Sequence, residues 1–301
     1  MTPREIIAQA WAITKKEKSL RRWGFLASFF ETLLNVKLLG YQAYFFYAFL
    51  VGRKVGLFDD FEWLYSHVPV WGFITIIVSF AVLLVIEFFM PHFCQGAIIG
   101  LAAKSYRKDP VKGGLVLALH NFFSLFAIHE IFVLSGWATA LSCISMTLRY
   151  IDGSIKYFMI GGIVLIFCLS NLLRLFAGFA EEAVVLRKAS ISEGIAQSYK
   201  LLISHLNHIM FVLLLLFVIS LRIILNAFTI LMIPAVIFGL GVVLALFLSP
   251  LLSYLIAGLV GVGLIFGASY FFAYLHVFKQ TVWTLTYIEL SSRKELDIID
   301  L

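Results

Sequence analysis

The chain has 301 residues, of which 62% are hydrophobic and only 13% are charged, and its mean hydropathy is +0.99. Soluble domains are about half apolar and about a quarter charged, so this composition excludes an ordinary soluble protein and indicates an integral membrane protein. The net charge is +6, but the basic residues stand in short segments beside apolar stretches, with no soluble domain that could present them to nucleic acid.

The first predicted element is an amphipathic surface helix over 3–18. Thr2 can cap it, Pro3 suits its first turn, and Glu5 completes a capping box. Apolar side chains recur on one face at helical spacing, and lysines end the segment. We expect this helix to lie at the boundary between water and lipid.

Six apolar stretches are long enough to cross a bilayer, which takes about 20 residues. We predict spans over 23–51, 70–103, 122–148, 157–186, 207–230 and 251–281. The stretch 231–249, bounded by Pro234 and Pro250, is marginal in length. We predict a re-entrant or tucked half-helix there; an interfacial helix and a full seventh span are the alternatives.

Two further surface helices are predicted, each directly before a span. The second begins with Asp109 as its cap and Pro110 in its first turn. The third covers 190–204, where Ser190 and Glu193 form another capping box.

The surface helices are related by an internal repeat. Glu5-Ile-Ile-Ala-Gln-Ala-Trp11 corresponds in residue type to Glu193-Gly-Ile-Ala-Gln-Ser-Tyr199 at all but one position, and 107–114 matches 187–194 in part. We predict three repeats of a surface helix and two spans, over 2–104, 105–187 and 188–290, followed by a polar tail at 291–301. The alternative is that amphipathic helices simply resemble one another.

The distribution of lysine and arginine predicts the topology. Sixteen of the 23 lie in the N-terminal segment, at 104–112, at 187–200 and in the C-terminal segment, whereas four lie in the opposite loops. This bias places both termini and all three surface helices in the cytoplasm. The same parity argues against a seventh span.

The segment Ala183-Val-Val-Leu186, followed by 187–199, resembles a broad group of bacterial integral membrane proteins. One member of that group is the membrane domain fused to some glycerophosphodiester phosphodiesterases. The resemblance implies a six-span module of the bacterial inner membrane without an established catalytic role. Glu181 and Glu182 stand earlier than the single acid of that group, and no phosphodiesterase domain is present.

Ionisable and polar side chains recur inside the predicted spans, where each needs a partner or a wet cavity. The candidate ligand-binding residues are Arg174, Glu181, Glu182, Arg222, Asn226 and Glu130. They are predicted either to form interhelical ion pairs that fix the register of the bundle or to line a polar passage or headgroup pocket. Snorkelling to solvent is the remaining alternative, chiefly for Lys37.

The sequence gives little support for two more specific hypotheses, an intramembrane protease and a metal site. Intramembrane CaaX-type proteases carry Glu-Glu, three residues and Arg; here four residues separate Glu182 from Arg187, although His276 fits their second element. His205 and His208 are interpreted as interfacial histidines, because no third metal ligand stands nearby. We therefore predict no catalytic residue, no metal and no cofactor.

The sequence thus predicts an all-α, multi-pass protein of the plasma membrane that acts as a scaffold or accessory module. Its expected partners are membrane lipids with anionic headgroups at the cytoplasmic face, and a second copy or a partner membrane protein. A transporter or lipid carrier that uses the buried charges is the alternative, and an intramembrane protease is a distant one.

Overall fold

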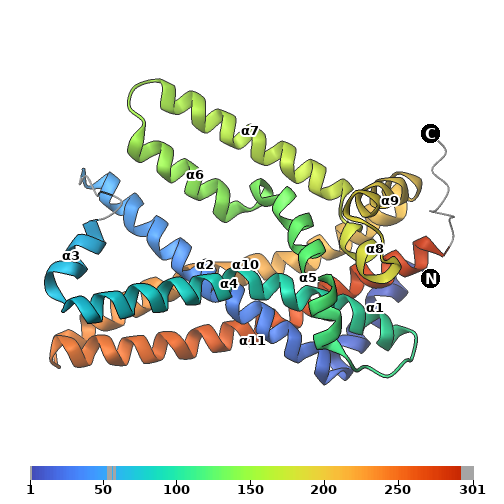
Figure 1. Ribbon diagram of the computed structural model, residues 1–301, viewed down its shortest axis with the longest axis horizontal. Coiled ribbons are helices and arrows are strands. Elements are labelled where there is room, and N and C mark those ends of the chain that lie inside the picture. Colours follow the sequence, from blue (N-terminus) through green and yellow to red (C-terminus); the bar gives the residue numbers. More distant parts are fainter. Residues whose placement is uncertain (1, 53–55, 57–58, 293–301) are drawn as a thin grey trace.

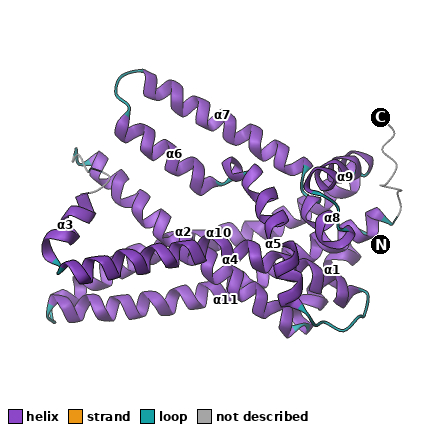
Figure 2. Cartoon of the chain, viewed as in Figure 1, coloured by secondary structure: helices purple, strands orange, loops and turns teal. Residues whose placement is uncertain are grey.

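The chain folds as helices throughout the part that the structure describes. This computed structural model describes residues 2–52, 56 and 59–292, and the side chains of all of these except 60, 218–231, 234, 250, 251 and 254. The elements are α1 (Pro3–Lys16), α2 (Lys18–Leu50), α3 (Asp59–His67), α4 (Val70–Tyr106), α5 (Gly114–Ile131), the 3₁₀ turn η1 (Val133–Ser135), α6 (Trp137–Tyr150), α7 (Ile155–Phe176), α8 (Ala180–Arg187), α9 (Ile191–Ser204), α10 (Leu206–Ala245) and α11 (Pro250–Ser291). Figure 2 shows these helices and the loops that join them.

Four long helices run lengthwise, and several of the short ones lie at the two ends. In Figure 1, α2, α4, α10 and α11 extend along the long axis of the molecule. The helices α1, α8 and α9 lie at one end, beside the last turns of α4 and α11, whereas α3 and the α10–α11 turn lie at the other end. The first and last described helices therefore meet at the same end, where Trp11 of α1 packs edge-on against Phe278 of α11.

Several helices are long and apolar enough to cross a membrane. Within the described residues they cover Val70–Tyr106, Gly114–Ile131, Ile155–Arg187 and Leu255–Ser291. A fifth crossing results if α9 and the start of α10, which are bent by 95° at His205, count as one span. The prediction of an all-helical protein with several potential membrane spans is confirmed at this level.

The predicted re-entrant segment at 231–249 is wrong. The helix α10 continues through Pro234 and ends only at Ala245, so the predicted fifth span and the following stretch form one helix of 40 residues. A proline inside a helix removes one backbone hydrogen bond, which apolar membrane helices tolerate when the neighbouring structure compensates. The chain turns instead before Ser249, which precedes a proline in the first turn of α11.

The second predicted surface helix and the third predicted span also differ from the structure. Asp109 and Pro110 lie in a loop, and α5 begins at Gly114 after Gly113, whose φ of +83° favours glycine. The predicted span 122–148 is broken after α5 by η1, where the Ser135 hydroxyl donates to the Phe132 carbonyl. The same carbonyl also accepts from the Ser135 N–H at 2.9 Å, so the backbone and the side chain of Ser135 together hold the turn that follows α5.

Both predicted capping boxes are present. The side chains of Thr2 and Ser190 accept from the backbone N–H of Glu5 and Glu193, whose carboxylates accept in return. The hydrogen bonds from Ser190 lower the pKa of the exposed Glu193 carboxyl. Both segments are therefore helical for the local reason that the sequence indicates.

The fourth predicted span is interrupted between α7 and α8, and a side chain of α9 bridges the break. The Ser198 hydroxyl donates to the Phe176 carbonyl at 2.7 Å and accepts from the Phe179 N–H at 2.9 Å. Gly194, also on α9, lies so close to α8 that an added Cβ would stand 3.1 Å from the Ala180 carbonyl oxygen. These contacts hold α8 against α9 and set the direction of its acidic first turn.

Candidate polar site around helix α8

The short helix α8 directs its two glutamates toward side chains of α4 and α11. Gln95 of α4 donates through Nε2 to Glu181 Oε2 at 2.9 Å, and its Oε1 lies 3.1 Å from Nε2 of His276 on α11. One glutamine thus links three helices that are distant in sequence. Glu181 and His276, the two elements of the protease hypothesis, contact the same side chain, whereas Arg187 is exposed at the end of α8.

Glu182 is buried and hydrogen-bonded to a second glutamine. Its side chain is 1% exposed, and Gln280 of α11 donates to Glu182 Oε1 at 2.7 Å. Within the described residues, Glu182 Oε2 has no hydrogen-bond partner. Because Gln280 follows His276 by four residues, one face of α11 supplies the contact to Glu182 of α8 and the contact to Gln95 of α4.

Arg174 adjoins this site, and among the described side chains it forms no direct ion pair with an acid. It donates through Nη1 to the Ser135 hydroxyl at 3.0 Å, and Asn171 donates to the Ser135 carbonyl at 3.1 Å. Arg174 and Lys279 both act electrostatically on Glu181. The predicted residues Arg174, Glu181 and Glu182 therefore belong to one region of the protein.

An interhelical ion pair occurs elsewhere in the bundle. Lys37 Nζ of α2 lies 2.7 Å from Glu87 Oε1 of α4. This pair agrees with the prediction that charges inside the spans form interhelical ion pairs, and it goes against the alternative that Lys37 snorkels to solvent. The buried Glu87 accounts for the pairing, because without Lys37 its carboxylate would be an unpaired charge inside the bundle.

Glu130 is the last of the predicted residues whose side chain the structure describes. It lies in the last turn of α5, beside His129 and opposite His92 of α4. Arg222 and Asn226 lie on α10, in the part of that helix whose side chains are outside the described residues. The sequence reasoning did not single out Gln95, Gln280 or His92. The only feature of the sequence that could have identified these three residues is that each is a polar side chain inside an apolar helix.

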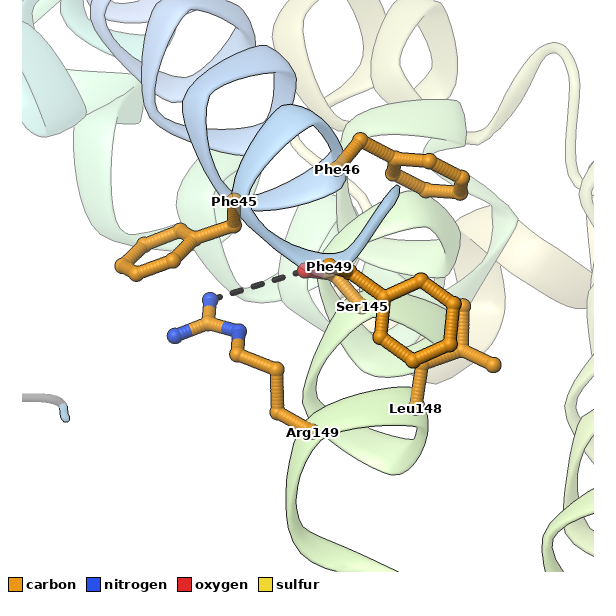
Figure 3. Close-up of a pocket in the computed structure, with 6 residues that line it drawn as sticks. All are labelled: Phe45, Phe46, Phe49, Ser145, Leu148 and Arg149. Carbon is orange, nitrogen blue, oxygen red and sulfur yellow. Dashed lines mark hydrogen bonds between the residues drawn. The ribbon is translucent and has the colours of Figure 1, made fainter. Parts of the chain in front are cut away.

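Two surface pockets lie away from this site. One, between α2 and α6, is lined by Phe45, Phe46, Phe49, Ser145, Leu148 and Arg149 (Figure 3). The Arg149 guanidinium stacks on the Phe45 ring at 3.2 Å from its centroid, which leaves about 10 Å³, too little for a ligand larger than water.

The second pocket opens at the corner between α9 and α10 and has a volume of about 360 Å³. It is lined by Ile203, Ser204, His205, Leu206, Asn207, His208 and Leu290. The two histidines that sequence analysis assigned to the water–lipid boundary thus border an open, polar corner at the end of a surface helix.

Comparisons with known proteins identify no relative: no family model, no curated protein and no solved structure matches the chain.

Proposed function

We propose that this protein is a non-catalytic, six-span module of the bacterial inner membrane that binds anionic lipids through helices lying on the cytoplasmic face. The observation that carries the proposal is the correspondence between α1 and α9. Each begins with a capping box, and each carries an aromatic residue at the same repeat position: Trp11 is 51% exposed and Tyr199 is 52% exposed.

Half-exposed tryptophan and tyrosine side chains are typical of the headgroup level, where the ring contacts acyl chains and its polar edge meets water. Basic residues accompany them. Lys15 and Lys16 end α1, and Lys188 precedes α9. A cytoplasmic leaflet rich in anionic lipids favours such residues by about 1 kcal/mol each.

The proposed six-span topology adds α2 and α10 to the helices identified above as long and apolar enough to cross a membrane. In Figure 1, α2 leads away from the end that holds α1, and α10 and α11 run antiparallel to each other. With both included, the two termini and all the predicted surface segments face the cytoplasm. The resemblance of 183–199 to bacterial integral membrane proteins is part of this proposal.

Lipid preference tests the proposal directly. The full chain is reconstituted in nanodiscs of mixed phosphatidylglycerol and phosphatidylcholine, and the lipids retained around it after mild detergent extraction are counted by native mass spectrometry. We expect enrichment of phosphatidylglycerol, reduced in a Trp11→Ala/Tyr199→Ala variant. Tyr157→Ala, which removes a more exposed aromatic side chain from α7 (68% exposed), is the control. Equal retention of both lipids by the unmodified protein would refute the proposal.

The non-catalytic part has its own test, which also covers the protease alternative. Lipids and peptides are incubated with the purified protein and with Glu181→Ala. Turnover by the unmodified protein that disappears in the variant would show an enzyme.

A second candidate is a carrier for a small polar solute or lipid headgroup. The observation that favours it is that Glu181 and Glu182 are held by glutamine amides, so binding a cation or a proton there requires no ion pair to be broken. Flux in proteoliposomes that is lost in Glu182→Gln would support it. Glu181→Cys that stays unlabelled by a water-soluble thiol reagent from either side, in a chain with its three native cysteines replaced, would count against it.

A further inference from the structure

We propose that His92, His129 and Glu130 form a binding site for a divalent first-row transition metal ion, with Zn²⁺ the preferred probe. The three residues come from two helices, α4 and α5, and one ligand atom of each lies within 4.8 Å of the others. This site is independent of the lipid-binding proposal and uses different side chains.

The residue types suit such an ion. Two imidazole nitrogens and one carboxylate oxygen are the protein ligands of many open zinc sites, in which solvent or a substrate takes the fourth position. Zinc–ligand distances of about 2.0–2.2 Å place tetrahedral ligand atoms roughly 3.4 Å apart. The side chains therefore need to move together by about 1 Å, which rotations about their own bonds can provide without a backbone shift.

The surroundings leave these ligands available. The centroids of the two imidazole rings lie 4.2 Å apart with the ring planes tilted by 48°, and neither ring has a hydrogen bond within the described residues. Glu130 Oε1 is buried and has no hydrogen-bond partner in the same part of the chain. A buried acceptor in that state is destabilising by about 1–3 kcal/mol, and coordination of a cation would remove the penalty.

The chain geometry at the site is fixed by features outside it. His129 and Glu130 lie in the last turn of α5, just before the break at η1, and His92 follows Pro91 in α4. Aromatic side chains enclose His92: the ring centroids of Phe88 and Phe126 lie 6.3 and 5.7 Å from its own. Such an apolar shell limits access of water and strengthens coordination by neutral and anionic ligands.

One nearby charge opposes cation binding. Arg174 acts electrostatically on both histidines, and repels a metal ion for the same reason. Its guanidinium is held by the Ser135 hydroxyl and lies in the field of Glu181, which offsets part of this repulsion. A single carboxylate ligand leaves the metal site with a net charge of +1, so we expect submicromolar to micromolar and not picomolar affinity.

Metal titration of the intact protein tests the assignment. The full chain in detergent is stripped with a chelator and titrated with Zn²⁺ by calorimetry, and with Co²⁺ by visible absorption. We expect one ion per chain, and a loss of affinity of at least about tenfold in each of His92→Ala, His129→Ala and Glu130→Gln. His120→Ala, an exposed histidine of α5, is the matched control and should bind as the unmodified protein does.

Two outcomes would overturn the proposal. One is the absence of Zn²⁺ and Co²⁺ binding at micromolar concentration; the other is equal binding by a His92→Ala/His129→Ala chain, which would assign the ion to His205 and His208 or to the surface. If any of the three single variants fails to fold, X-ray absorption of a zinc-loaded His205→Ala/His208→Ala chain decides, because that chain lacks the competing histidine pair. Two imidazoles in the coordination shell support the site, and none or one refutes it.

Discussion

Removal of the Lys37 charge is expected to destabilise the contact between α2 and α4. The Glu87 side chain is 0% exposed and that of Lys37 is 28% exposed, with 2.7 Å between Nζ and Oε1. Lys37→Met keeps most of the apolar stem but leaves the carboxylate buried without its cation. Breaking a buried pair from one side costs about 3–5 kcal/mol. Because Lys37 keeps part of its exposure, we expect a loss near the lower value, about 3 kcal/mol.

A double-mutant cycle measures this effect. The free energy of unfolding is obtained by titrating detergent-solubilised protein with a denaturing detergent, for Lys37→Met, Glu87→Gln and the double variant. The double variant should recover most of the loss, because no charge remains buried in it. Lys16→Met, an exposed lysine of α1, should change stability by less than about 0.5 kcal/mol. A Lys37→Met chain as stable as the unmodified protein, or a double variant no better than Lys37→Met, would refute the reasoning.

Three further predictions follow from backbone contacts at the ends of helices. Ser198→Ala should lower the free energy of unfolding by about 1–3 kcal/mol, because it leaves the Phe176 carbonyl and the Phe179 N–H at the α7–α8 break without the Ser198 hydroxyl. The same denaturation assay measures this change, and an unchanged value would contradict the role of Ser198 in bridging the break. Glu193 has a lowered pKa, so its stabilisation of α9 is present at neutral pH and is lost as pH falls through the folded-state pKa. The hydrogen-exchange protection factors of 191–204, corrected for the intrinsic exchange rate at each pH, should fall in acid, and Glu193→Gln should remove that response. Lys108 and Lys188 have φ of 61° and 57°, a left-handed conformation that glycine adopts without strain. Lys108→Gly and Lys188→Gly should therefore each raise the free energy of unfolding by about 0.5–1 kcal/mol, measured by thermal denaturation. Destabilisation by either substitution would show that the lysine side chain matters more than the backbone conformation.

The features that the sequence predicted correctly depend on residues close together in the chain. The capping boxes of α1 and α9 each need only a hydroxyl and a glutamate three positions later, and both are present. Local apolar length likewise predicted membrane-capable helices at Val70–Tyr106 and Leu255–Ser291. The error at 231–249 had a local cause too, since proline ends helices in water more strongly than in an apolar bundle.

The candidate site could be predicted only as a set of unusual residues. Glu181 and Glu182 stood out because charges inside apolar helices are rare. Their partners could not be found in the same way, because Gln95 lies 86 positions from Glu181 and Gln280 lies 98 positions from Glu182. The pairing depends on how α4 and α11 are rotated about their axes, and that rotation is set by packing over the whole bundle.

The backbone supplies an argument for the internal repeat that residue identity alone does not. Lys108 and Lys188 occupy equivalent positions in the aligned segments 107–114 and 187–194, and both are in the left-handed conformation. Lys188 directly follows α8, and Lys108 is the second residue after the end of α4. Non-glycine residues adopt this conformation rarely, so its recurrence at one aligned position is unexpected for helices that resemble each other only in composition. After that point the two segments differ: Ser190 caps α9, whereas Gly113 precedes α5 four residues farther from its preceding helix. The internal repeat therefore stays a prediction, favoured by the shared turn at the helix end and by the fact that a glycine can replace a capping residue at a helix start.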